Sequence, residues 1–174
     1  MAKYKILKMM CGAPGSGKST WVRNHLDNNS IVISRDQIRF NMVKEDEYYF
    51  SKEDDVFRTF IRQIQNAIND ENGPDCIYCD ATHMTENGRN KVLDRLRLDN
   101  VELEAVVVMP SLTEVLRRNE QRQGREKVPN EAVVRMYRSY EDPRFDGKHP
   151  FKRITMVTEG ITYDIWNIKG DNNE

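Results

Sequence analysis

The run GAPGSGKS, residues 12–19, matches the pattern GxxxxGK[ST], in which a glycine-rich loop surrounds phosphate groups. Residues 4–10 before it alternate apolar and basic side chains, as a short strand does, and residues 18–26 after it predict a helix. The pattern requires this strand, loop and helix context. The stretch therefore predicts a nucleoside triphosphate site, and the alternative is a glycine-rich turn before an ordinary helix.

Each residue type in this loop suits phosphate binding. Gly12, Gly15 and Gly17 allow backbone N–H groups to close around phosphate oxygens, and the helix N-terminus adds its positive dipole end. Lys18 reaches the outer phosphates, and the Ser19 hydroxyl is a ligand for Mg²⁺. We expect ATP to contact the whole run: Gly12, Ala13, Pro14, Gly15, Ser16, Gly17, Lys18, Ser19 and Thr20.

Length and charge limit the class of protein. A chain of 174 residues with a net charge of -1 fits a single domain over residues 1–174, without the broad basic face of a protein that coats long nucleic acid. This charge does not exclude binding to one end of a nucleic acid. Residues 1–10 are too polar for a signal peptide and no run is long enough to span a membrane, so we expect a cytoplasmic protein with no membrane partner. No pattern indicates an oligomeric state.

The three cysteines do not form an even disulfide framework. Cys76 and Cys79 fall in a predicted strand, where an offset of three places the two sulfurs on opposite faces. We interpret them as buried thiols rather than a metal or redox pair.

Strand and helix patterns alternate along the chain, which predicts an α/β fold with a mostly parallel central sheet flanked by helices. The expected strands are 4–10, 31–34, 76–79, 103–109, 154–158 and 161–168, the last two in a strand-rich tail of about 150–170. The expected helices are 18–26, 52–69 behind a Ser51 capping pattern, 86–98, one that starts at Ser111 and continues to Gly124, and one capped by Asn130. A helical lid is expected at about 117–130.

Proteins with this phosphate loop include switches, motors and kinases. The guanine-binding NKxD of switches is absent, because the nearest string, residues 90–93, reads NKVL inside a predicted helix. Asp80 is followed by Ala81, Thr82 and His83, so the glycine of a DxxG switch is absent. The residue directly after Asp80 is Ala81 and not the acidic residue of a motor ATPase. A kinase remains, and it needs an acceptor site, a general base and a cationic lid.

Candidate groups for a kinase follow the predicted strands. Asp36 follows the second strand at the carboxyl edge of the sheet, so it is a candidate base, and Arg39 lies on the same side of a helical turn to hold an anionic acceptor group. The alternative makes Asp36 a helix N-cap and Arg39 a surface charge. Asp80, after the third strand, is the second acid, or else a loop cap before Thr82.

Four arginines crowd the predicted lid within nine residues: Arg117, Arg118, Arg122 and Arg125. Guanidinium groups beside a phosphate loop suit a phosphate clamp, and the alternative is a solvated helix face. We expect Arg118, Arg122 and Arg125 to contact ATP, and Lys18, Asp36 and Arg122 to be catalytic.

GAPGSGKSTW, ISRDQIR, DEYYFSK, YCDATH, RRNEQR and KVPNEAVVRMYRSY together resemble, in the same order, the kinase half of the bacteriophage polynucleotide kinase-phosphatase family. The resemblance spans about residues 5–142. It implies that Asp36 deprotonates a 5′-hydroxyl, that Arg39 holds the phosphate on its 3′ side, and that Asp80 orders the site beside Thr82. It also implies that the terminal base packs on Val128 and Pro129 and that Arg122 bridges the donor phosphates, although a lid one residue longer than the family pattern leaves Arg125 as the alternative.

The sequence therefore predicts an ATP-dependent kinase of the 5′-hydroxyl end of DNA or RNA, with Mg²⁺. A kinase of a small molecule such as a nucleoside, nucleotide or sugar is the first alternative, and an ATP-binding regulator is the second. No residue distinguishes DNA from RNA or a single strand from a recessed end, and no base-specific pocket for adenine is visible.

Overall fold

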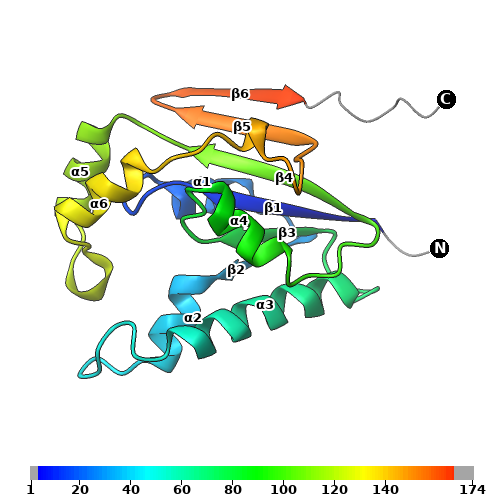
Figure 1. The fold of residues 1–174 in the computed structure, drawn as a ribbon, viewed down its shortest axis with the longest axis horizontal. Helices are drawn as coiled ribbons and strands as arrows, with labels where there is room; N and C mark the ends of the chain where they lie inside the picture. Colours follow the sequence, from blue (N-terminus) through cyan, green and yellow to red (C-terminus); the bar gives the residue numbers. More distant parts are fainter. Residues whose placement is uncertain (1–3, 167–174) are drawn as a thin grey trace.

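The computed structural model describes residues 4–166, and within them one sheet has the strand order β2-β3-β1-β4-β5-β6 (Figure 1). Neighbouring strands run parallel from β2 to β5, and β6 pairs antiparallel with β5. The fold is the predicted α/β class with a mostly parallel sheet. The strands are β1 (Lys5–Cys11), β2 (Ser30–Ser34), β3 (Cys76–Asp80), β4 (Val101–Val108), β5 (Arg153–Thr158) and β6 (Ile161–Trp166).

The strand register brings three functional segments to one edge. Ser34, the last residue of β2, pairs with Asp80, the last residue of β3, and Asp80 pairs with Met10 of β1. The phosphate loop leaves β1 one residue later, at Cys11. Because parallel strands end at the same edge, the loop, Asp80 and the start of the next helix meet there.

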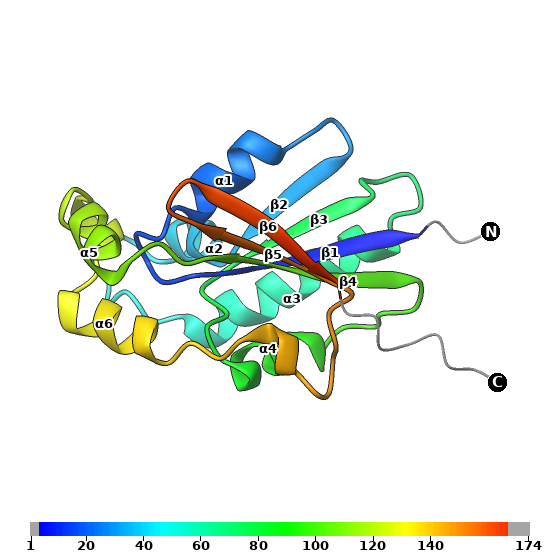
Figure 2. The ribbon, with the colours of Figure 1, turned by 90° about the horizontal axis from the view of Figure 1, so that it is seen from above.

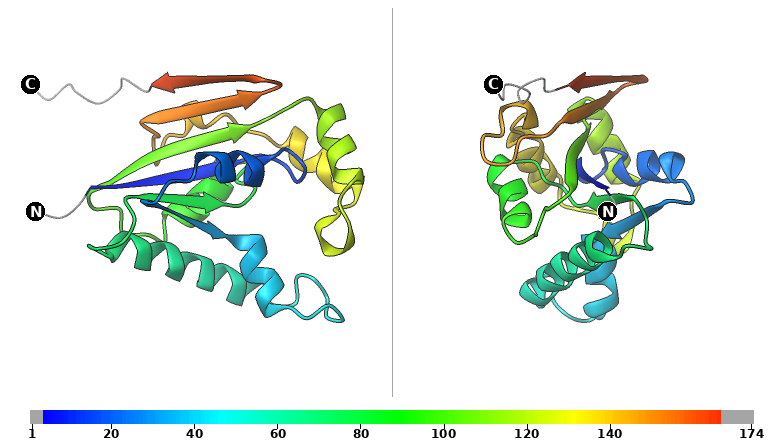
Figure 3. Two further views of the ribbon diagram at one scale, coloured as in Figure 1. Left: turned by 180° about the vertical axis from the view of Figure 1, so that it is seen from behind. Right: turned by 90° about the vertical axis from the view of Figure 1, so that its right-hand side faces the viewer.

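The helices cover both faces and this edge. They are α1 (Lys18–His25), α2 (Arg35–Met42), α3 (Glu53–Asn69), α4 (Glu86–Leu93), α5 (Leu112–Glu120) and α6 (Asn130–Arg138), with 3₁₀ turns at Gly124–Glu126 and Pro143–Phe145. Figure 2 shows α1 on one side of the strands and α3 and α4 on the other. Figure 3 shows α5, α6 and the α2–α3 loop gathered at the end of the molecule where the parallel strands finish.

Alternation along the strands divides the core in two. Leu7 and Met9 of β1 face Phe60 of α3 in the larger cluster, whereas Met10 faces Val22 of α1 in the smaller one. Cys79 belongs to the larger cluster, and Cys76 packs against the smaller one on the other face, as its spacing predicts. Within residues 4–166 there is no helix that combines the length and the apolar character needed to cross a bilayer.

Several predicted boundaries were wrong. The helix 86–98 ends at Leu93, and the helix after Ser111 ends at Glu120, before Gly124. Lys52 rather than Ser51 precedes α3, with no side-chain cap, and Asn130 is the first residue of α6 rather than its cap. The helix α2 was absent from the expected elements, and the expected strand residues 167–168 lie outside the described part of the chain.

Candidate active site

The phosphate loop adopts a conformation that only glycine accepts without strain. Gly15 has φ +85° and Gly17 has φ +103°, both in the left-handed region. A Cβ atom on Gly15 would lie 2.7 Å from the Val115 carbonyl oxygen, and one on Gly17 would lie 2.9 Å from Arg118 Nη1. Both glycines thus let α5 approach the loop closely.

Lys18 lies across the loop at the start of α1. Its Nζ donates to the carbonyl oxygens of Gly12 at 2.7 Å and Ala13 at 3.2 Å. Burial lowers the pKa of Lys18, and the nearby carboxylates of Asp80 and Asp36 oppose that lowering. The ammonium group is therefore available to exchange carbonyl oxygens for phosphate oxygens.

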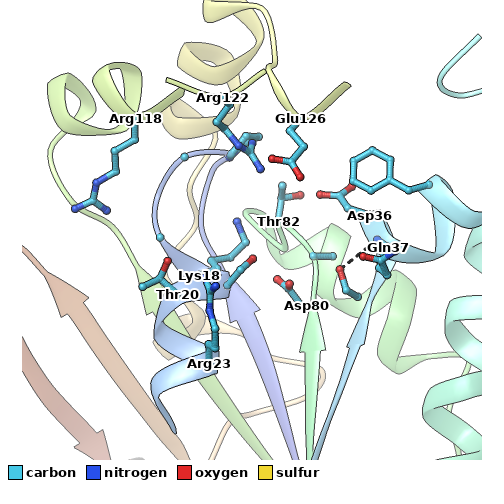
Figure 4. Close-up of a pocket in the computed structure, with 17 residues that line it drawn as sticks. Lys18, Thr20, Arg23, Asp36, Gln37, Asp80, Thr82, Arg118, Arg122 and Glu126 are labelled. Carbon is cyan, nitrogen blue, oxygen red and sulfur yellow. Dashed lines mark hydrogen bonds between the residues drawn. The ribbon is translucent and has the colours of Figure 1, made fainter. Parts of the chain in front are cut away.

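A cavity of about 540 Å³ opens above the loop at the carboxyl edge of the sheet (Figure 4). Gly12, Ala13 and Ser16 do not line it, and Ala13 and Ser16 are buried. Arg125 does not line it either. The expected residues that do line it are Pro14, Gly15, Gly17, Lys18, Ser19, Thr20, Asp36, Asp80, Thr82, Arg118 and Arg122.

Asp80 and Ser19 place two oxygen groups in this cavity. Burial raises the pKa of Asp80, while Lys18 and the hydroxyls of Ser19 and Ser34 lower it. A buried carboxylate beside a hydroxyl is a donor set that suits Mg²⁺, which takes oxygen ligands and completes its shell with phosphate and water. These residues therefore fit the predicted metal.

Asp36 stands in the first turn of α2 but is not its cap. Ser34 is the N-cap, and its hydroxyl accepts from the Gln37 N–H at 3.4 Å. Asp36 Oδ1 instead accepts from Arg39 Nη1 at 2.5 Å and from the Tyr49 hydroxyl at 3.4 Å. The Asp36 side chain is still 62% exposed, so the interpretation of Asp36 as a cap was wrong and the carboxylate can receive a proton from the cavity.

Arg39 is buried rather than a surface charge, which excludes that alternative. Its Nε and Nη2 atoms donate to the Glu53 carboxylate at 3.0 and 2.9 Å. Its guanidinium also lies 4.9 Å from the Tyr49 ring centroid and 5.4 Å from that of Phe50. Two carboxylates and two rings therefore fix its position.

A second cavity of about 240 Å³ lies beside the first, between α2, the α2–α3 loop and the lid. Arg39, Arg125 and Val128 line it, but Pro129 does not. Asp36 and Arg122 line both cavities. The two spaces thus meet between a carboxylate and a guanidinium, with the remaining shared lining from Pro14, Phe40, Ala81, Thr82 and Glu126.

The four lid arginines have different partners. Arg117 pairs with Glu114 on the exposed face of α5, and Arg118 donates to Glu114 and to the Ser16 carbonyl oxygen at 2.9 Å. Arg125 Nη1 donates to the Val43 carbonyl oxygen at 2.7 Å, and its guanidinium lies 5.0 Å from the Phe40 ring. Within residues 4–166, the Arg122 guanidinium makes no hydrogen bond or ion pair, and Figure 4 shows it pointing toward the loop.

Asn119 holds the lid in place and was not among the predicted residues. It is fully buried at the end of α5. Its Nδ2 donates to the Val128 carbonyl oxygen at 2.6 Å, and its Oδ1 accepts from the Val128 N–H at 3.2 Å. The segment between α5 and α6 is thereby tied to the helix that touches the phosphate loop.

Other lining residues were also missed. Phe40 is one turn after Asp36 on α2, a spacing that could have identified it. Glu53, Tyr49 and Phe50 come from the α2–α3 segment, and no sequence spacing links them to Asp36. Glu126, in the lid between Arg125 and Lys127, was not among the predicted site residues, yet it lines both cavities.

A family model described as an AAA domain (AAA_33) matches residues 7–143, from β1 through α6. The chain belongs to this AAA domain family. Its P-loop, Gly12 to Ser19, lies at the start of the matched region, so the family fold and the cavity over the loop indicate a nucleotide-binding site.

Solved structures share the fold at low identity. A chain in the structure of the Pnkp1/Rnl/Hen1 RNA repair complex is 19% identical with a TM-score of 0.67, over 80% of this chain and 45% of that chain. A fungal RNA kinase is 11% identical with a TM-score of 0.57, over 100% of this chain and 81% of that chain. A Janibacter sugar kinase is 14% identical with a TM-score of 0.52, over 89% of this chain and 85% of that chain. This chain thus spans less than half of the RNA repair chain, and the likeness shows the fold alone.

Proposed function

We propose that this protein transfers the γ-phosphate of ATP to the 5′-hydroxyl end of DNA or RNA. The observation that carries the proposal is the junction of the two cavities, where Asp36 and Arg122 lie. One cavity contains the P-loop and is the donor side. The other, of about 240 Å³, is lined by aromatic and apolar side chains together with charged ones, and it is the proposed acceptor side.

In the proposed reaction, Asp36 accepts the proton of the 5′-hydroxyl. The 5′ oxygen attacks the γ-phosphorus, the bond from that phosphorus to the β–γ bridging oxygen breaks, and ADP leaves with the electron pair. Arg39 and Tyr49 both donate to Oδ1 of Asp36, which orients the carboxylate toward the junction.

Lys18 and Arg122 stabilise the charge on the transferred group. Lys18 reaches it from the loop and Arg122 from the lid, on the opposite side of the cavity (Figure 4). Mg²⁺ held by Ser19, with Asp80 ordering its shell, would offset phosphate charge during transfer. Arg118 is proposed to hold the loop through the Ser16 carbonyl oxygen.

The acceptor is proposed to lie against Val128, with Thr82 and Asp80 below it and Pro129 supporting Val128 from the start of α6. Arg39 is the proposed partner of the phosphate on the 3′ side. Arg125 adds a second guanidinium to this cavity and uses one of its donors on Val43, so further donors remain for that phosphate.

One observation favours a small-molecule kinase as the second candidate. Glu53 and Asp36 both pair with Arg39, so much of its charge is already offset inside the acceptor cavity. An uncharged acceptor such as a nucleoside or sugar would need no more positive charge than that. Phosphorylation of free nucleosides in preference to 3′-phosphorylated nucleotides would favour this candidate.

The test compares Asp36→Asn with wild type in transfer of phosphate from Mg-ATP to a 5′-hydroxyl oligonucleotide. Removal of the base is expected to lower kcat by about 10² to 10⁴ and to leave ATP binding unchanged. Asp55→Asn, which changes an exposed carboxylate on α3, is the matched control and should keep full activity. Tight ATP binding with indifference to Asp36→Asn would contradict the proposal and favour an ATP-binding regulator.

A further inference from the structure

Two large aromatic side chains are exposed to solvent beside the acceptor cavity. Tyr48 is 74% exposed and Phe50 is 51% exposed, in the loop between α2 and α3. Phe50 and its neighbour Tyr49 line the acceptor cavity, whereas Tyr48 lies outside it. Figure 1 shows this loop projecting at the same end of the molecule as the lid segment between α5 and α6. We call Tyr48, Tyr49 and Phe50 the aromatic loop.

The rings form a continuous path from the cavity to solvent. Phe40 lies in the cavity with its ring centroid 6.1 Å from that of Tyr49. Tyr49 and Phe50 are 4.8 Å apart at 84°, and Phe50 and Tyr48 are 5.9 Å apart at 66°. Because these contacts are edge-on, the rings are not stacked face to face on one another. The Arg39 guanidinium lies 5.4 Å from the Phe50 ring centroid, so Tyr48 is the outer ring with the most exposed surface.

The charges around the aromatic loop do not suit phosphate binding as its main role. Lys44, Glu45, Asp46 and Glu47 precede the rings and Lys52 follows them, so residues 44–52 carry three acidic and two basic side chains. Glu47 already accepts from Lys52 Nζ at 3.1 Å and from the Lys44 N–H at 2.9 Å. An acidic segment repels a nucleic-acid backbone, so a nucleic acid would be held here through its bases and not through its phosphates.

We propose that the aromatic loop is a stacking surface for the bases that follow the terminal nucleotide of a single-stranded acceptor. This inference rests on the proposed function and adds a binding surface for the nucleotides beyond the terminal one. Aromatic side chains bind successive bases of a single strand through their π-faces, without reading sequence.

The test measures KM for two acceptors, a 3′-phosphorylated mononucleotide that fills only the cavity and a 5′-hydroxyl tetranucleotide that reaches the aromatic loop. Tyr48→Ala should raise KM for the tetranucleotide by about five- to tenfold and leave the mononucleotide value unchanged. Tyr48→Phe keeps the ring and should restore the wild-type value. Phe145→Ala removes another exposed ring, 78% exposed in the 3₁₀ turn Pro143–Phe145 and not part of the acceptor-cavity lining, and should change neither KM.

The two acceptors separate a failure of the stacking surface from a failure of the proposed function. If wild type phosphorylates the mononucleotide and Tyr48→Ala leaves the tetranucleotide KM unchanged, the stacking surface is wrong and the proposed function stands. If Tyr48→Ala changes only the sedimentation of the protein, the loop binds a protein or a second copy, which also overturns the inference. If wild type phosphorylates neither acceptor, the proposed function itself fails.

Discussion

Arg39 Nη1 lies 2.5 Å from Asp36 Oδ1, three residues away on the first turns of α2. Glu53 holds the other side of the same guanidinium through Nε and Nη2 and also pairs with Arg35. The buried Arg39 guanidinium therefore holds one oxygen of the Asp36 carboxylate, while the rest of the carboxylate faces the cavity. This arrangement orients the carboxylate before any acceptor arrives.

Arg39→Lys should lower kcat by about tenfold to a hundredfold, because one ammonium cannot bridge Glu53 and Asp36 and a shift of about 1 Å in a catalytic group has a cost of that order. Steady-state kinetics measure this change. Arg58→Lys is the matched control, since Arg58 pairs with Asp55 at the same spacing on an exposed helix face. Equal losses in both variants would exclude a specific role for the Arg39 pair.

Gly17→Ala should weaken ATP binding by about tenfold or more. The left-handed φ of Gly17 costs a side chain about 1–2 kcal/mol, which is the main effect, because the Arg118 Nη1 atom 2.9 Å from the added Cβ is the end of a flexible side chain and can move. Titration calorimetry with ATP measures the loss. Gly147→Ala, where a Cβ meets no atom within 4 Å, should bind ATP like wild type, and an unchanged affinity of Gly17→Ala would refute the loop geometry.

Asn119→Ala should destabilise the protein by about 1–3 kcal/mol, because the N–H and carbonyl of Val128 lose their partner inside the fold. It should also raise KM for the acceptor, since Val128 lines the acceptor cavity. Urea unfolding and kinetics test the two effects. Asn72→Ala, at an exposed position, serves as the control, and a stable variant with an unchanged KM would show that Asn119 does not hold the lid.

Stability should fall as the pH drops from about 6.5 toward 4 because of His83. Burial lowers the pKa of His83 from 6.5 to about 4. As the pH falls, His83 therefore takes up a proton in the unfolded chain before it does so in the folded protein. The stability that neutral His83 contributes is fully present above pH 6.5 and is lost as the pH falls from 6.5 toward 4. Each unit of lowering corresponds to about 1.4 kcal/mol.

Urea unfolding at pH 7, 6 and 5 measures the slope, above the range in which most carboxylates titrate. His83→Asn is the comparison variant, because asparagine tolerates the left-handed φ of 41° found at this position. Its stability should change less between pH 7 and 5 than that of wild type. Parallel curves for the two proteins would show that His83 is not the titrating group.

The fold was largely predictable, because hydrophobic alternation and helical spacing are local patterns. The P-loop pattern at residues 12–19 located β1 and α1, and the capping pattern at Ser111 located the start of α5, where Ser111 Oγ accepts from the Glu114 N–H. Helix ends were predicted less well. The apolar spacing continues through Leu96, which still packs against the core, but α4 stops at Leu93 and the chain goes on in tighter turns such as Leu96 N–H to the Leu93 carbonyl oxygen.

The site was predictable where it follows strand ends and not where it depends on contacts distant in sequence. Asp36 comes just after β2 and Asp80 ends β3, so topology alone brings them to the same edge of the sheet. Glu53 reaches Arg39 from fourteen residues away, across a loop, and its role follows from side-chain contacts that no spacing encodes. The lid arginines illustrate the same limit, since composition could not tell Arg122, which faces both cavities, from Arg125, which lines only one.

Phosphorylation of a 5′-hydroxyl end is measured by transfer of radiolabelled γ-phosphate from Mg-ATP. The acceptors are one oligonucleotide prepared with either a 5′-hydroxyl or a 5′-phosphate, and free nucleosides. For a 5′-hydroxyl kinase we expect label on the 5′-hydroxyl form alone, recovered after nuclease digestion as the 5′-terminal nucleotide. Label only on free nucleosides, or equal label on both forms of the oligonucleotide, would contradict it.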